Sequence, residues 1–104
     1  MKIPPPNLRA PDFLELGAET FRSRNATYGD TYRQFGEVMS AMFPEGLSVY
    51  DVDDWNRLGV FVMCVGKLCR YSANLIEGGH KDSAHDLMVY AAMLEELTEN
   101  DRSV

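Results

Sequence analysis

The fold depends most on one apolar run, LGVFVMCV at residues 58–65, which lies between Arg57 and Lys67. The run is apolar on nearly every side of a helical wheel, a pattern typical of a helix that other helices surround. It is far shorter than the roughly 20 residues that a membrane-spanning helix needs. We therefore predict that it forms the centre of the most buried helix, and we expect no contact with a membrane.

On both sides of this run, apolar residues recur at three- and four-residue steps, and Gly, Pro and Asn separate the segments. The sequence predicts helices at residues 12–25, 31–43 and 82–98, and a third helix that follows a cap at residues 48–51 and runs to residue 75 or 76. A loose capping box, Ser48 with Asp51, precedes the third helix. The apolar side expected on the first helix consists of Phe13, Leu14, Gly17, Ala18 and Phe21. The inward stripe expected on the fourth consists of Leu87, Tyr90, Ala91, Leu94 and Leu97.

These segments indicate an all-α fold of about four helices packed as a small bundle, because no segment alternates with period two for long enough to form a sheet. An extended arm is expected at residues 1–11, which hold four of the five prolines. One helical domain at 12–98 and a polar tail at 99–104 follow. A chain of 104 residues buries one small core, so we expect a homo-oligomer that completes it.

The composition limits the class of partner. The net charge is −6, from 16 acidic and 10 basic residues. An acidic surface repels phosphate backbones, so we expect no direct DNA or RNA binding, although a local basic patch can bind a small anion. Cys64 and Cys69 would face different sides of one helix, which favours free thiols. The N-terminus has no apolar segment, and the chain is therefore expected in the cytoplasm.

Two carboxylates stand at the start of the fourth predicted helix, in HKDSAHD at residues 80–86. Asp82 and Asp86 are four residues apart, so they share one helical face beside the apolar stripe. Carboxylate oxygens in such a place can hold Mg²⁺. The alternative is structural, because the helix dipole stabilises acids in a first turn and Asp82 could simply be the N-cap.

Two basic residues, Lys67 and Arg70, lie one turn apart at the end of the buried helix. They could neutralise phosphate charge, or they could pair with Asp82 and Asp86 in a structural network.

A third set lies in RNATYGD, residues 24–30. Tyr28 offers a flat ring for stacking, and Asp30 could cap a helix or coordinate a metal. Glu15 and Glu19 are possible further ligands, or they belong to a solvated helix face.

Together, three motifs resemble a phage and prophage family of small proteins related to nucleotide-modification-associated domains and, more distantly, to the MazG-like all-α nucleotide pyrophosphohydrolases. The motifs are R…YGD…F (24–35), V…KLCR (62–70) and HKDSAHDLMVYAAML (80–94). The resemblance covers roughly residues 20–95, and its most specific piece is KDS..D...YA. It implies a helical, usually oligomeric protein that acts on or senses nucleotides.

In MazG-like enzymes, acidic residues on two helices hold Mg²⁺, which bridges a triphosphate that activated water attacks. The resemblance matches Asp82 and Asp86 to the later acidic motif, with Glu15 and Glu19 as stand-ins for the earlier one. The glutamates of the family are more closely clustered than these two.

The leading hypothesis is a phage-type protein in the host cytoplasm that binds a nucleotide and hydrolyses a nucleoside triphosphate with Mg²⁺. The metal ligands would be Asp82, Asp86 and one of Asp30, Glu15 or Glu19. Lys67 and Arg70 would neutralise the phosphates, and Tyr28 or Tyr90 would stack on the base. The rival hypothesis is a non-catalytic accessory protein that binds a host protein or sequesters a nucleotide, with the two basic residues paired to the two aspartates.

Overall fold

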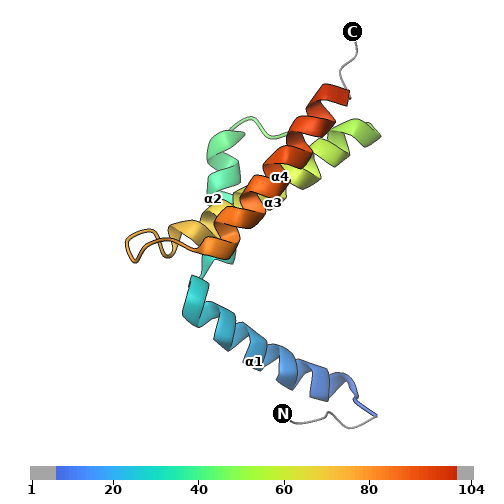
Figure 1. The fold of residues 1–104 in the computed structure, drawn as a ribbon. Coiled ribbons are helices and arrows are strands. Elements are labelled where there is room, and N and C mark those ends of the chain that lie inside the picture. Colours follow the sequence, from blue (N-terminus) through green and yellow to red (C-terminus); the bar gives the residue numbers. More distant parts are fainter. Residues whose placement is uncertain (1–6, 101–104) are drawn as a thin grey trace.

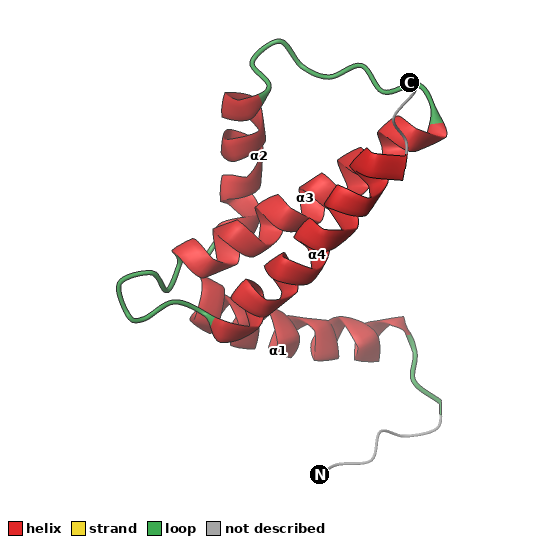
Figure 2. Ribbon diagram, turned by 45° about the horizontal axis from the view of Figure 1, so that its top comes forward, coloured by secondary structure: helices red, strands yellow, loops and turns green. Residues whose placement is uncertain are grey.

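The computed structural model describes residues 7–100, which form four α-helices: α1 (Ala10–Tyr28), α2 (Thr31–Met42), α3 (Val52–Ser72) and α4 (Lys81–Asn100). No strand occurs in this range, so the all-α prediction is confirmed. Helices α3 and α4 lie antiparallel and side by side, α2 packs on α3, and α1 projects away from the other three (Figures 1 and 2). None of the described helices is long and apolar enough to cross a membrane.

The N-terminal helix begins at Ala10, two residues before the predicted start. Pro11 stands in the first turn, where its fixed φ suits a helix and no N–H is required. Asp12 is therefore not the first residue of α1; its carboxylate accepts a hydrogen bond from the N–H of Arg9 at 2.9 Å. The helix ends at Tyr28, and the C-cap residue Gly29 follows with a φ of +65°, which favours glycine. The part of the predicted arm at residues 1–6 lies outside the described residues.

The boundaries of α3 also differ from the predicted ones. Asp51 is itself the N-cap and accepts a hydrogen bond from the N–H of Asp54 at 2.8 Å, so the predicted box with Ser48 is wrong. The helix ends at Ser72, before the predicted end, because turns occupy residues 73–78. Gly79 has a φ of +88° and lies so close to the Tyr71 ring that a Cβ would collide with it.

The C-terminal helix begins at Lys81 and continues to Asn100, past the predicted end at residue 98. Residues 99 and 100, expected in the polar tail, are thus helical, and residues 101–104 of that tail lie outside the described part of the chain. Leu87, Tyr90, Leu94 and Leu97 are half-buried as predicted, whereas Ala91 is exposed.

The core lies between α3 and α4 and is small. The buried residues among 7–99 are Val65 (2% exposed), Cys69 (6%) and Ser83 (2%). Phe43 and Phe61 add an edge-to-face contact at 5.5 Å between ring centroids. As predicted, the central helix is α3 and both cysteines are free thiols. Burial raises the pKa of the Cys69 thiol, which therefore stays protonated and is a poor nucleophile.

Helix α1 packs differently from the prediction. It contains no buried residue, and its expected inward side is exposed, with Phe13 at 59%. Its contacts come from the last two turns: Phe21 meets the Tyr32 ring edge-on at 6.0 Å, and the Asn74 amide donates to the Thr27 carbonyl oxygen at 3.3 Å. The turn at residues 29–30 directs the rest of α1 away from α3 (Figure 1).

Candidate functional site

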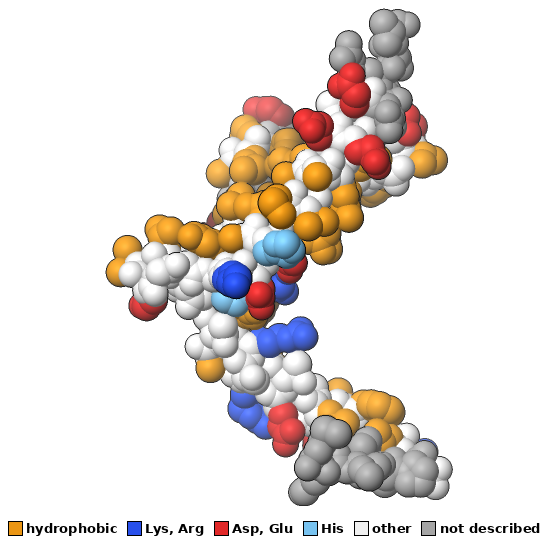
Figure 3. Space-filling view, viewed as in Figure 1, with side chains coloured by type: hydrophobic (Ala, Val, Ile, Leu, Met, Phe, Trp, Pro, Cys, Tyr) orange, Lys and Arg blue, Asp and Glu red, His pale blue; other side chains and the backbone are white. Residues whose placement is uncertain are grey.

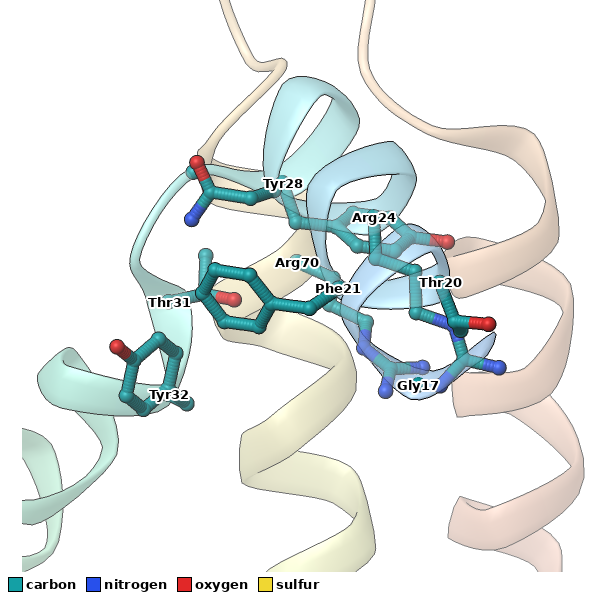
Figure 4. Close-up of a pocket in the computed structure, with 10 residues that line it drawn as sticks. Gly17, Thr20, Phe21, Arg24, Tyr28, Thr31, Tyr32 and Arg70 are labelled. Carbon is teal, nitrogen blue, oxygen red and sulfur yellow. The ribbon is translucent and has the colours of Figure 1, made fainter. Parts of the chain in front are cut away.

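A pocket of about 450 Å³ lies where the end of α1 meets the start of α2 and the end of α3 (Figure 4). This volume falls in the range typical of small-molecule sites. The pocket brings together two of the predicted residues, Tyr28 and Arg70. The side chains with chemical significance that line it are Phe21, Arg24, Tyr28, Tyr32 and Arg70.

The α1 side of the pocket follows from helical periodicity. Gly17, Phe21, Arg24 and Tyr28 are separated by steps of four, three and four residues, so they share one face of α1. The turn at Gly29 then brings the first residues of α2 against the same space, with Tyr32 beside Phe21. The wall thus consists of side chains that the sequence places on one stripe.

The Tyr28 ring is held in place by contacts with two other side chains. The Arg70 guanidinium lies over its face, 5.2 Å from the centroid, as in a cation–π interaction. The His80 ring meets it edge-on at 5.2 Å between centroids. Because Arg70 and His80 contact the Tyr28 ring, the ring is held in one orientation at the pocket wall.

The pocket is electropositive in a chain of net charge −6. Two arginines and no carboxylate line it. In Figure 4 the side chains of Arg24 and Arg70 extend toward the same end of the pocket. Neither guanidinium has a carboxylate within ion-pair distance among residues 7–100. Asp30, close by in sequence, instead accepts a hydrogen bond from the Asn25 amide at 2.7 Å. The two guanidinium groups are therefore available to an anionic ligand.

Lys67 has a different environment from Arg70. Its Nζ lies 3.0 Å from a carboxylate oxygen of Asp86, and the two side chains are 15% and 44% exposed. This ion pair joins α3 to α4 and neutralises the lysine. The predicted pairing of Lys67 with an aspartate is thus present, whereas Arg70 turns toward Tyr28 instead.

The start of α4 is capped by a histidine. The Nδ1 atom of His80 accepts a hydrogen bond from the backbone N–H of Ser83 at 3.2 Å and lies 2.7 Å from its Oγ. Accepting at Nδ1 requires that this nitrogen carry no proton. His80 therefore does what an Asn or Asp N-cap usually does. The predicted role of Asp82 as the N-cap of the fourth helix is wrong, because Asp82 lies inside the first turn of α4, where it is exposed.

The predicted metal ligands do not come together. Glu15 and Glu19 lie on the exposed part of α1, and Asp86 is paired with Lys67. Asp30 stands at the N-cap position of α2, but its carboxylate bonds to Asn25 and not to the helix. Across the described range, no three or more His, Cys, Asp or Glu side chains are grouped so that they could hold a metal ion. These residues therefore do not fit a protein-held Mg²⁺ site. Tyr90, the second predicted stacking residue, lies half-buried on α4.

Three of these five pocket side chains, Phe21, Arg24 and Tyr32, were not among the predicted ligand-binding residues. The first two lie on α1. Their signal in the sequence is the i, i+3, i+7 spacing of Phe21, Arg24 and Tyr28 on one helix face. The spacing shows that the three side chains point the same way, but it does not reveal that α3 supplies Arg70 opposite them.

Comparisons of the chain with protein-family models, with curated protein sequences and with solved structures found no match. The resemblance to phage and MazG-like proteins therefore stays a prediction. The assignment of the site rests on the contacts and charges of the pocket.

Proposed function

We propose that this chain binds a nucleotide, with the phosphates on Arg24 and Arg70 and the base against Tyr28. The observation that carries the proposal is the lining of one pocket by two guanidinium groups and three aromatic rings, with no carboxylate. A guanidinium group can bind phosphate oxygens through two parallel hydrogen bonds. Aromatic rings provide a stacking surface for a base.

A free nucleotide explains the pocket better than a simple anion or a nucleic-acid strand. A simple anion would need the cations but not the rings. A strand brings many phosphates, which a net charge of −6 repels outside the pocket. A nucleotide has phosphates for the two arginines and a base for the aromatic rings, and the pocket has a volume of about 450 Å³. The resemblance in the sequence motifs implies the same class of ligand.

Sensing or sequestration of the nucleotide is favoured over hydrolysis. The Lys67–Asp86 ion pair occupies one of the two aspartates of α4, and no further acid from another described helix joins them. In this proposal Mg²⁺ arrives bound to the nucleotide, and the nucleotide is released unchanged. The protein would act as a homo-oligomer in the cytoplasm, where free nucleotides are present.

Thermal melting of the full chain against nucleoside mono-, di- and triphosphates, each with and without Mg²⁺, tests the proposal. A ligand that binds the folded state stabilises it by about 1.4 kcal/mol at ten times its Kd. For a domain of this size that corresponds to a rise in Tm of roughly 5–10 °C. We expect such a rise without Mg²⁺.

Other results would contradict the proposal. Unchanged melting curves with every nucleotide would refute it and favour a protein partner. Release of pyrophosphate that requires Mg²⁺ would show that the chain is a hydrolase and not a sensor.

A further inference from the structure

We propose that a second copy of this chain covers the apolar face of α1, defined here as Phe13, Leu16, Gly17 and Phe21. In this arrangement α1 of each copy lies against the groove between α2 and α3 of the other. Gly17 and Phe21 of this face, and Arg70 of the groove, also line the pocket proposed for the nucleotide, so the second copy would lie beside the ligand. The inference does not require that the ligand be a nucleotide, and it identifies the surface through which the chain would self-associate.

The first support is that, among the described residues, α1 packs on the rest of the chain only through its last turns. It is a 19-residue helix without a buried residue, and Phe13, Leu14, Leu16 and Phe21 are all exposed large apolar residues. Helices in proteins derive most of their stability from packing an apolar face. Gly17, Thr20 and Ser23 lower the intrinsic helix propensity of this segment further. Another surface must therefore cover α1 for it to be a stable helix.

The second support is the amount of exposed surface. The chain exposes 8426 Å², whereas a compact monomer of 11.7 kDa exposes about 5,900 Å². Its radius of gyration is 17.7 Å, against about 13 Å for a compact domain of this length. The excess is about 2,500 Å² per copy and includes the surface of the residues outside 7–100. Obligate homodimers bury about 2,000–5,000 Å² for both copies together, so burial of about half of this excess in each copy reaches that range.

The third support is a receiving groove beside α1. A hollow of about 440 Å³ lies between α2 and α3 and is lined mainly by apolar side chains, among them Tyr32, Phe35, Val62, Met63 and Cys69. It shares Tyr32 and Arg70 with the pocket of about 450 Å³ that Arg24 and Arg70 line, which we call the arginine pocket. Gly17 and Phe21 of α1 line that pocket, so the apolar face of α1 adjoins the groove. One surface thus carries both a projecting helix and a groove.

Such a surface is self-complementary. In a two-fold dimer, residue i of one copy contacts residue j of the other, and residue j contacts residue i. A projecting α1 and an adjacent groove satisfy this condition, since each copy supplies one helix and receives one. The open angle between α1 and the other helices leaves room for this exchange (Figure 1).

A second exposed apolar patch lies on α4, with Met88, Val89 and Met93 (hydrophobic side chains over α3 and α4 are visible in Figure 3). Helix α4 already packs on α3 through its opposite side, whereas α1 packs mainly through its end. The need for a partner is therefore greater at α1. The patch on α4 provides a comparison for the experiment, because Met88 is 61% exposed and Phe13 is 59% exposed.

The test is sedimentation equilibrium of the full chain from micromolar to submillimolar concentration. We expect a species of twice the 11.7 kDa chain mass. Phe13→Glu should raise the dimer dissociation constant about thirtyfold or more, because it buries an unpaired charge in the interface. Ala26→Glu adds the same charge on the opposite side of α1 and should leave the constant unchanged. Phe13 does not line the arginine pocket, so nucleotide binding can be measured separately.

Three results would overturn the inference. The first is a wild-type chain that stays monomeric throughout this range. The second is a Phe13→Glu chain that associates as tightly as wild type while Met88→Glu dissociates, since the interface would then lie on α4. The third comes from amide hydrogen exchange of the wild type, which needs no variant: α1 should lose protection on dilution before α3 and α4 do. Protection of α1 that does not depend on concentration would contradict its burial by a second copy.

Discussion

Two basic residues, Lys67 and Arg70, lie one turn apart on α3, and their environments are opposite. Lys67 reaches α4 and is neutralised by Asp86 at 3.0 Å. Arg70 lies over the Tyr28 ring, and Arg24 lines the same pocket, which contains no carboxylate. Basic residues at neighbouring positions can therefore serve different purposes. The ion pair joins two helices, whereas the arginine pocket retains positive charge for a ligand.

The comparison also explains why an acidic protein can bind an anion. No acidic residue of the described range lines the arginine pocket, and the nearby Asp30 accepts a hydrogen bond from Asn25 and interacts electrostatically with Arg33. A local cluster of cations can attract an anion despite the net charge of the chain. For anion binding, the charge around the pocket thus matters more than the net charge of the chain.

The largest expected effect is loss of nucleotide binding on removal of both arginines. Hydrogen bonds to charged groups contribute about 1.5–3 kcal/mol each. Arg24→Ala combined with Arg70→Ala should therefore weaken binding at least about 100-fold, measured by calorimetric titration. The matched control is Arg9→Ala with Arg22→Ala, which removes the same charge outside the pocket. Equal weakening in the two double variants would show that binding follows net charge and not this pocket.

A smaller effect is expected at the aromatic wall. Stacking of a base on an aromatic ring contributes about 1–3 kcal/mol, so Tyr28→Ala should raise the nucleotide Kd roughly tenfold to a hundredfold. Tyr28→Phe keeps the ring and should bind almost as tightly as the wild type. Fluorescence titration with a nucleotide that carries a fluorescent base measures both variants. Weak binding by Tyr28→Phe would mean that the hydroxyl, and not stacking, makes the contact.

On the α4 side, the expected effects concern stability and not binding. His80→Ala removes the N-cap of α4 and should cost about 1 kcal/mol in the free energy of unfolding. His80→Asn provides a side-chain oxygen for the same backbone N–H and should recover most of this loss. Urea denaturation measures both variants. A His80→Ala chain as stable as wild type would show that the cap is not needed.

The smallest effect is expected for the Lys67–Asp86 ion pair. Because Asp86 is 44% exposed, solvent screens the interaction, and a coupling of less than about 1 kcal/mol is expected from a double-mutant cycle with Lys67→Met and Asp86→Asn. Nucleotide affinity should stay within about twofold of wild type in both single variants. A tenfold weaker affinity in Asp86→Asn would instead assign this aspartate to the ligand.

The sequence predicted the helices well because their signals are local. Apolar periodicity located all four helices, and the run at 58–65 correctly indicated that α3 is central. Helix ends were less accurate, since the cap at His80 uses a residue type that rarely caps a helix. The predicted packing of α1 was wrong because periodicity reveals an apolar face but does not show what covers it.

The candidate site was only partly predictable for a related reason. Tyr28 and Arg70 were selected as separate candidates, 42 positions apart in the sequence. The structure brings the Arg70 guanidinium to 5.2 Å from the centroid of the Tyr28 ring. Arg24 was missed because its role depends on the turn at Gly29, which directs this face of α1 toward α3. The acids predicted as metal ligands are not brought together in this way. They lie on α1, at the start of α2 and on α4.

The most direct measurement is a titration of ¹⁵N-labelled protein with a nucleoside triphosphate, followed by NMR without Mg²⁺. If the arginine pocket is the binding site, the largest chemical-shift changes occur at the amides of Arg24, Tyr28, Gly29 and Arg70, with small changes at Asp82 and Asp86. Changes concentrated at the two aspartates, or none at saturating nucleotide, would contradict the account.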